Sequence, residues 1–197
     1  MDEQVKCEGN TIFFFCTVDD DTVRELCVFL KKLSMTHETI KLCIRSDGGD
    51  VYAGFTAFDY IKTIIAQGTA VETIAYGQCA SAATFILIAG SKRLMGKNAY
   101  VLIHQLNAEA GGTYNDLCDI MKENKHLMKH FRRLYLEHTE IPEEILEKHL
   151  NRDISMSSRK CLKYQIVQEL IWAFHYRVFP KKAWQWEPNH NNVPGPA

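Results

Sequence analysis

Short apolar runs alternate with longer amphipathic stretches along most of the chain. The runs that are rich in β-branched and aromatic residues have the length of buried strands, and they cover residues 11–18, 40–45, 69–76 and 100–104, with a weaker one at 94–95. Between the first three runs, apolar residues recur at helical spacing over residues 23–33 and 55–65. A purely apolar run at 84–90, which Gly90 ends, predicts a buried helix. The order β-α-β-α-β-α predicts an α/β fold with a parallel sheet and crossover helices.

The second half of the chain predicts a long helix followed by short elements. Apolar residues repeat at roughly heptad spacing from Thr113 to about His138, which is long for a helix in one small domain. Such a helix either packs on the core or projects and pairs with a partner subunit. Pro142 begins a short helix, residues 157–163 predict another, and residues 164–170 predict a final strand.

The composition changes near the C-terminus. Residues from 171 onward hold all three Trp and four of the five Pro. We therefore expect a single domain over residues 1–170 and a Trp- and Pro-rich extension, partly disordered, over residues 171–197.

Composition and charge narrow the class of protein. The 197 residues are 46% hydrophobic and 24% charged, as in globular proteins, and the net charge of −1 gives no electrostatic footprint for nucleic acid. Seven cysteines without a C-x-x-C pair argue against a disulfide framework and for a reducing compartment. The eight histidines show no metal-ligand spacing, the first residues form no targeting signal, and no apolar run is long enough to span a bilayer. We expect a soluble cytoplasmic protein with neither metal nor cofactor.

One candidate for chemistry is the small-residue stretch 77–83, which joins a predicted strand to the apolar helix. It places Ser81 at the positive end of that helix, where the amide of Ala82 can face an oxyanion. Taken alone, the stretch favours a simpler interpretation, in which Ser81 is a helix N-cap.

Other candidates lie at the ends of neighbouring strands. Gly48 and Gly49 follow the strand at 40–45, His104 ends the strand at 100–104, and Asp153 lies in a later loop. Each has an ordinary structural explanation by itself. Together, a serine, a histidine and an aspartate are the parts of a nucleophilic triad, and backbone amides complete it by holding the oxyanion. The order Ser…His…Asp differs from that of chymotrypsin, subtilisin and the α/β-hydrolases.

These motifs resemble those of the ClpP serine peptidases, which are cylindrical self-compartmentalised proteases. The segments SDGGDVYAGFTAFDYI, GQCASAATFILIAG, VLIHQ and NRDISMS follow one another in the family's order between about Phe13 and Leu170. The resemblance implies an α/β fold of the crotonase-like ββα superhelix type with a long protruding handle helix. It also implies a homo-oligomer, a heptameric ring that stacks in pairs through that helix, and unfolded protein or peptide as substrate.

The resemblance assigns roles residue by residue. Ser81 is the implied nucleophile, His104 the general base and later acid, and Asp153 the residue that orients His104. The amides of Gly49 and Ala82 form the implied oxyanion hole. The implied substrate-binding residues, which pair with an extended peptide by β-addition, are Gly48, Gly111 and Gly112.

Several departures from the family pattern bear on its partners. About ten residues precede Thr11, where the family carries a longer pore segment, and residues 41–44 lack the aromatic side chains of the docking strand. Both speak against the family's AAA+ unfoldase partner. Asn151 stands where the family has an acidic residue beside Arg152, which leaves ring stacking open, and Leu106 replaces the proline after His-Gln.

Three functions are consistent with these observations. The first is a serine endopeptidase in a multi-subunit barrel. The second is a non-catalytic structural or regulatory subunit of such a ring, which the departures favour and the complete triad opposes. The third is an acyl-CoA enzyme of the crotonase fold, which would keep the oxyanion amides and need no triad.

Overall fold

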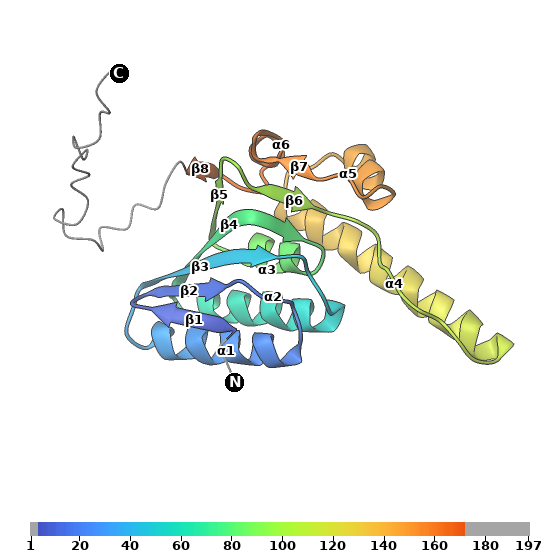
Figure 1. Ribbon diagram of the computed structural model, residues 1–197, viewed down its shortest axis with the longest axis horizontal. Coiled ribbons are helices and arrows are strands. Elements are labelled where there is room, and N and C mark those ends of the chain that lie inside the picture. The colour runs from blue at the N-terminus through green and yellow to red at the C-terminus, as the bar shows by residue number, and fades with distance from the viewer. Residues whose placement is uncertain (1–3, 172–197) are drawn as a thin grey trace, which may run out of the picture.

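A twisted, mostly parallel sheet forms the centre of the computed structural model, which describes residues 4–171 (Figure 1). The main path of the sheet follows the order β1 (Val5–Glu8), β2 (Thr11–Phe14), β3 (Thr39–Ser46), β4 (Ala70–Ala80), β5 (Lys92–Gly96) and β8 (Glu169–Ile171). Beside this path, β6 (Tyr100–Leu102) pairs with the end of β4, and β7 (Met156–Ser157) pairs with β6. All pairings are parallel except β1–β2 and β6–β7, so the predicted parallel sheet is confirmed.

Three helices cover one face of the sheet. In Figure 1, α1 (Asp20–Ser34) and α2 (Val51–Ala66) lie below the strands, with α3 (Ala83–Ala89) beside them. Helix α1 begins with an acidic cap, because the Asp19 carboxylate accepts from the Thr22 amide at 2.8 Å. All seven residues of α3 are buried, as the purely apolar run predicted.

The opposite face of the sheet carries a smaller apolar cluster. Cys43, Ile74 and Leu94 are buried there, one from each of three adjacent strands. Phe13, Tyr76 and Ile171 pack against them. Aromatic side chains are therefore present on this face, although they come from β2 and β4 and not from β3.

The long helix α4 (Tyr114–His138) both packs and projects. Its buried residues are Phe131, Leu134 and Tyr135, all in its C-terminal third. Tyr114, at the other end, is 80% exposed. Figure 1 shows this N-terminal end extending away from the sheet. The predicted protruding handle is confirmed: the helix packs on the core at one end and projects at the other, while its pairing with a partner subunit stays a prediction.

Some predicted boundaries were wrong. Strand β1 was not predicted, although the alternation of V-K-C-E and the Gly9 turn at φ +58° are signals for a hairpin. Strand β8 has three residues, because Ile166 and Val167 are buried in the turn after α6 (Ser158–Lys163) and pair with no strand. Helix α5 (Glu143–Leu150) starts directly after Pro142, as expected.

Among residues 4–171, no helix combines the length and the apolar character that crossing a membrane requires. The predicted C-terminal extension, apart from Ile171, lies outside the described residues.

Candidate active site

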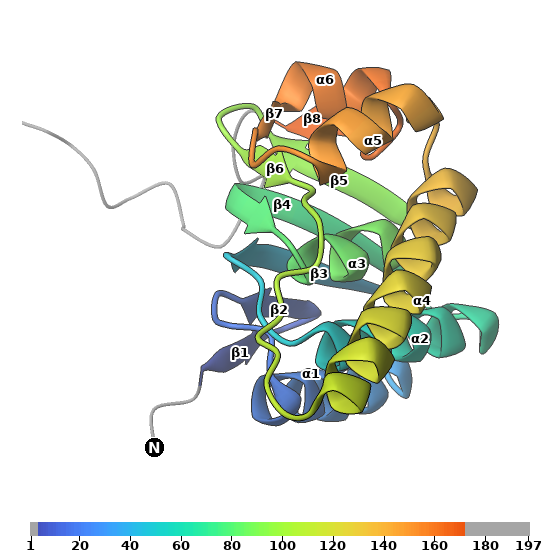
Figure 2. The same ribbon diagram turned by 90° about the vertical axis from the view of Figure 1, so that its right-hand side faces the viewer.

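The candidate residues gather where parallel strands end. Gly48 and Gly49 follow β3, and Ser81 follows β4. Strand β6 runs beside the end of β4, with Ala80 opposite Leu102, and so brings His104 to the same edge. Figure 2 looks onto these carboxyl ends, and the connection from β6 to α4 passes across them. Ligands of open α/β sheets bind at this edge.

Ser81 occupies a strained turn. Its φ is +54°, in the left-handed region that disfavours residues with a Cβ by about 1–2 kcal/mol. The turn is held because the Ser81 amide donates to the Leu102 carbonyl at 2.9 Å. The N-cap of α3 is Ala82, and no side chain caps this helix, so the interpretation of Ser81 as an N-cap is wrong. Strain of this kind clusters at functional sites.

A buried hydroxyl pair supports the Ser81 turn from below. Thr84 Oγ1 donates to the Ser81 carbonyl at 2.6 Å and lies 2.5 Å from the hydroxyl of Tyr135. Because Thr84 has a single hydroxyl proton, Tyr135 is the donor in the second bond. Burial raises the pKa of the Tyr135 phenol far above its ordinary value, which keeps this donor protonated. The sequence reasoning missed both residues.

Close approach of backbones explains the two glycines. A Cβ on Gly48, where φ is +98°, would lie 2.5 Å from Ser81 Cβ. A Cβ on Gly49 would overlap the Val18 carbonyl oxygen. The Val18 amide donates to the Gly48 carbonyl at 2.9 Å, and the Asp50 amide donates to the Val18 carbonyl at 2.7 Å. The Gly49 amide, which lies between these two bonds, donates to no described residue. The same holds for the Ala82 amide within residues 4–171, so two amides remain free to bind an anion.

Ser81 and His104 line one small cavity of about 90 Å³. Gly49 and Ala82 form part of its wall, and the rings of Phe85 and Phe131, with centroids 5.2 Å apart, form an apolar part. A nucleophile, a base and two backbone amides thus share one enclosed space. Neither Gly111 nor Gly112 lines it.

His104 lies near Asp153 without the geometry of a hydrogen bond. The distance from His104 Nδ1 to Asp153 Oδ1 is 3.7 Å, which is longer than such a bond allows. The Asp153 side chain is 78% exposed and that of His104 22%. No hydrogen bond joins Ser81 Oγ to His104, both of which lie in the described part of the chain. The aligned triad therefore stays a prediction. These distances do not exclude it, because catalytic hydrogen bonds are often long in the free enzyme and shorten when substrate binds.

The loop that carries Asp153 is anchored by a residue that the sequence reasoning missed. His149 is 8% exposed, and its Nδ1 donates to the Ile154 carbonyl at 3.0 Å. The Gln105 amide donates to the Leu150 carbonyl at 2.9 Å, which ties the segment after His104 to the same helix end.

Gly111 and Gly112 lie in the loop that precedes α4. The start of this helix explains why one of the two positions needs glycine. Gly112 has φ +128°, and a Cβ there would lie 2.7 Å from Asp116 Oδ2, the acceptor of the α4 capping box. Gly111 is in open space. Their role in substrate binding stays a prediction. Within residues 4–171, no group of three His, Cys, Asp or Glu side chains is arranged to hold a metal ion.

Comparison with known proteins reveals close relatives. Residues 5–173 match the family described as Clp protease. The ATP-dependent Clp protease proteolytic subunit of Deinococcus radiodurans is 34% identical over 136 residues, which are 68% of this chain and 65% of that protein. Subunit 2 from Rhodococcus jostii is 32% identical over 81% of this chain and 83% of its own length. The subunit from Pinus thunbergii is 36% identical over 63% of each chain.

A solved structure agrees with these matches. A ClpP1 variant from Listeria monocytogenes superposes with a TM-score of 0.73 and 28% sequence identity, over 84% of this chain and 92% of that one. This chain spans just under two thirds of the Deinococcus and Pinus proteins and most of the other two.

Proposed function

The chain belongs to the Clp protease family, and we propose that it is the peptidase subunit of a self-compartmentalised serine endopeptidase. One observation carries the proposal most directly. The strained Ser81 shares a cavity with His104 and with two backbone amides that bind nothing else among the described residues. The relatives are named as proteases, which favours this function over an acyl-CoA enzyme of the same fold.

The proposed mechanism uses only side chains and backbone of this site. Ser81 Oγ attacks the carbonyl carbon of a peptide bond while His104 takes its proton, and the Gly49 and Ala82 amides hold the oxyanion. His104 then protonates the leaving amine, and an acyl-enzyme on Ser81 remains. Water, deprotonated by His104, releases the acid and restores Ser81. Asp153 holds the imidazole in the required tautomer and stabilises its charged form.

Catalysis in this scheme requires a small rearrangement. The 3.7 Å between His104 Nδ1 and Asp153 Oδ1 must shorten by several tenths of an ångström to form a hydrogen bond. We propose that assembly or substrate supplies this movement. The Asp153 side chain is largely exposed, so its loop has room to close.

Several finer points belong to the same proposal. The relatives are named as subunits, and we propose a homo-oligomer, with a heptameric ring and stacking of two rings through α4 as its specific form. The substrate is an unfolded or short peptide that pairs with the backbone near Gly48 and Gly111–Gly112. The relatives are also named ATP-dependent, so an AAA+ unfoldase is a partner to test. All seven cysteines are free thiols, which supports a reducing, cytoplasmic setting.

Hydrolysis of a fluorogenic peptide tests the proposal. We expect Ser81→Ala to reduce kcat/KM by at least about a thousandfold, since the nucleophile is lost. Ser34→Ala on α1 is the matched control and should leave the rate unchanged. Equal activity of the wild type and Ser81→Ala would reject the assignment.

The alternative of a non-catalytic ring subunit has one specific observation in its favour. Ser81 and His104 are not hydrogen bonded, and His104 and Asp153 stand 3.7 Å apart. If this alternative is right, the purified chain hydrolyses no peptide at any concentration or assembly state, and it increases the activity of a catalytic partner subunit when the two are mixed.

A further inference from the structure

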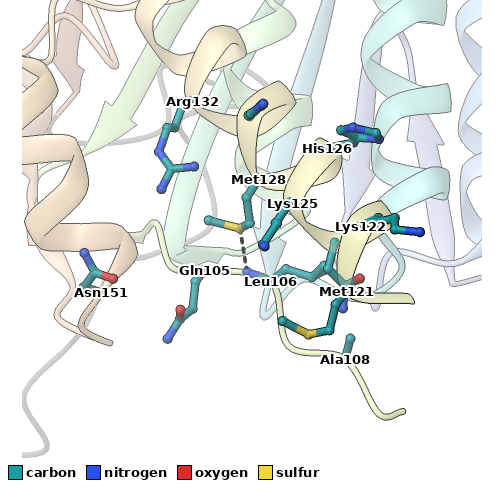
Figure 3. A pocket seen from close by; sticks show the side chains of 12 residues that line it. Gln105, Leu106, Ala108, Met121, Lys122, Lys125, His126, Met128, Arg132 and Asn151 are labelled. Atoms are coloured by element: carbon teal, nitrogen blue, oxygen red, sulfur yellow. Dashed lines mark hydrogen bonds between the residues drawn. The ribbon is translucent and has the colours of Figure 1, made fainter. Parts of the chain in front are cut away.

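A second and larger cavity adjoins the candidate active site. It has a volume of about 610 Å³ and lies between α4 and the segment that follows His104 (Figure 3). Gln105 and Leu106 line both this cavity and the small one that holds Ser81. A peptide bound at Ser81 can therefore place a neighbouring side chain in the larger cavity.

The floor of this cavity is apolar and held in place. The Leu106 amide donates to the sulfur of Met128 at 3.2 Å, the contact drawn as a dashed line in Figure 3. Leu106 and Met128 are both partly buried against the main core. Met121, one turn before Lys125, adds to the same apolar surface. This hydrogen bond joins the loop to the helix.

The charged side chains of the lining are all basic. Lys125, Lys129 and Arg132 follow one another at i, i+4 and i+7 on α4, so they share one face of the helix. Figure 3 shows the Lys125 side chain reaching from α4 towards the loop at Leu106, with Gln105 and Asn151 across the opening from Arg132. No Asp or Glu is among the described residues that line the cavity.

The two lysines differ from the arginine in their partners. Arg132 is bound by both carboxylate oxygens of Glu147, so its charge is largely offset. Neither Lys125 nor Lys129 forms an ion pair with another residue of the described part of the chain. Lys122 also lines the cavity, but its ammonium pairs with Asp119 at 2.9 Å. The positive charge without a carboxylate partner among the described residues therefore sits on Lys125 and Lys129.

We propose that this cavity is a substrate subsite that selects acidic side chains, so that the enzyme prefers peptides with Glu or Asp beside the cleaved bond. A Glu side chain fits the cavity because its methylene groups can cover Leu106 and Met128 while its carboxylate meets the lysines. Exposed ion pairs contribute little free energy to binding. We therefore expect kcat/KM for a Glu peptide to be about fivefold higher than for the peptide with the uncharged isostere Gln. The inference rests on the proposed peptidase function.

Paired peptides test the subsite. A set of quenched fluorogenic peptides carries Glu, Gln or Lys at each position around the cleaved bond, and the kcat/KM ratio of Glu to Gln is measured at each position. We expect one position, or two adjacent ones, to give a ratio of about five at low salt and a smaller ratio at high salt, where the lysine charges are screened. A ratio near one at every position would overturn the proposal.

Two variants connect the preference to the cavity. Lys125→Gln/Lys129→Gln should bring the ratio close to one, and Lys125→Glu/Lys129→Glu should make the Lys peptide the preferred one. Lys31→Gln/Lys32→Gln on α1 removes the same charge elsewhere and should keep the wild-type ratio. Retention of the Glu preference in Lys125→Gln/Lys129→Gln would contradict the proposal. Because each ratio is internal to one enzyme preparation, a change in the active fraction does not affect it.

A binding measurement distinguishes failure of the proposed subsite from failure of the proposed peptidase function. Rhodamine-labelled Glu and Gln peptides are titrated with the Ser81→Ala chain, and dissociation constants are read by fluorescence anisotropy. If the wild type cleaves no peptide, the proposed peptidase function fails, while tighter binding of the Glu peptide still supports the subsite. Equal binding of the two peptides would reject the subsite even in an active enzyme.

Discussion

At the scale of single residues, the site depends on backbone geometry that few residue types permit. Gly48 and Gly49 adopt positive φ at 98° and 149°, and Ser81 adopts φ +54° directly opposite them. The left-handed turn presents the serine side chain to the cavity, and the glycines allow two strand ends to meet there. The chemistry proposed for Ser81 is therefore sensitive to changes that add a single methyl group.

Gly49→Ala tests this sensitivity. The new Cβ would overlap the Val18 carbonyl oxygen and move the Gly49 amide, so we expect loss of peptide hydrolysis together with a lower free energy of unfolding. Gly68→Ala is the matched control, because Gly68 also has positive φ but has no atom within 4 Å of an added Cβ. The control should lose about 1–2 kcal/mol of stability and keep its activity. Equal activity of the two variants would contradict the account. Urea unfolding and peptide hydrolysis measure both quantities.

Sequence motifs identified the residues that carry chemistry better than those that support them. Ser81, His104 and Gly49 stand in recognisable segments, and the structure brings them to one cavity. The Thr84–Tyr135 pair could not be predicted, because 51 residues separate its members and only the packing of α3 on α4 brings them together. His149 was missed because a histidine near the end of a helix resembles a surface residue, whereas the fold buries it.

At the scale of elements, the strands were predicted in type and order but less well in extent. β4 continues through Gly77 and Gln78 to Ala80, where small and polar residues suggested a turn. The extension forms because β6 pairs with this end of β4, a long-range contact that no local pattern reveals. The same pairing positions His104, so the part of β4 that was not predicted belongs to the candidate active site.

The junction of α4 and α5 offers a test at this scale. Arg132 on α4 and Glu147 on α5 form a two-bond ion pair that is partly buried. The hydrogen bond from Arg132 holds the pKa of the Glu147 carboxyl below its ordinary value. A lowered carboxyl pKa stabilises the fold above the ordinary pKa, and this stabilisation is lost as the pH falls through the lowered value.

We therefore expect Arg132→Gln to reduce the free energy of unfolding at pH 7 by about 1 kcal/mol, with a smaller difference from the wild type below about pH 4. Arg133→Gln is the control, because Arg133 and Glu137 form an exposed pair on one helix, with Nε and Oε1 3.8 Å apart. The control should change stability little at either pH. A difference for Arg132→Gln that is the same at pH 7 and pH 3.5 would show that packing, and not charge, is responsible. Chemical denaturation at the two pH values measures the free energy of unfolding of each variant.

At the scale of the whole molecule, the exposed end of α4 is the feature that a single chain does not explain. Tyr114 and Met121 are 80% and 55% exposed, and Leu117 is 39% exposed. These residues recur at helical spacing on the part of α4 that extends from the sheet (Figure 1). Such a projecting apolar stripe is typical of a surface that another subunit covers.

Assembly through α4 gives a further prediction. Tyr114→Glu/Leu117→Glu, which changes no residue that lines either cavity, should shift the protein to a smaller species in size-exclusion chromatography with light scattering, because it places charge in the proposed contact. Val28→Glu on α1 replaces an apolar residue of similar exposure, 60%, far from α4, and should leave the mass unchanged. An unchanged mass in the α4 variant would exclude this end of the helix from the subunit contact. Peptide hydrolysis by the smaller species would further show whether the triad aligns without that contact.

The most direct test of the central claim is covalent labelling of the wild-type chain with a fluorophosphonate, followed by mass spectrometry of the digested protein. The probe reacts with a serine only where a base and an oxyanion site activate its hydroxyl. Our account predicts a single modified residue, Ser81, and a loss of labelling in both Ser81→Ala and His104→Ala. Labelling at another serine, or equal labelling of Ser81 after His104 is replaced, would contradict it.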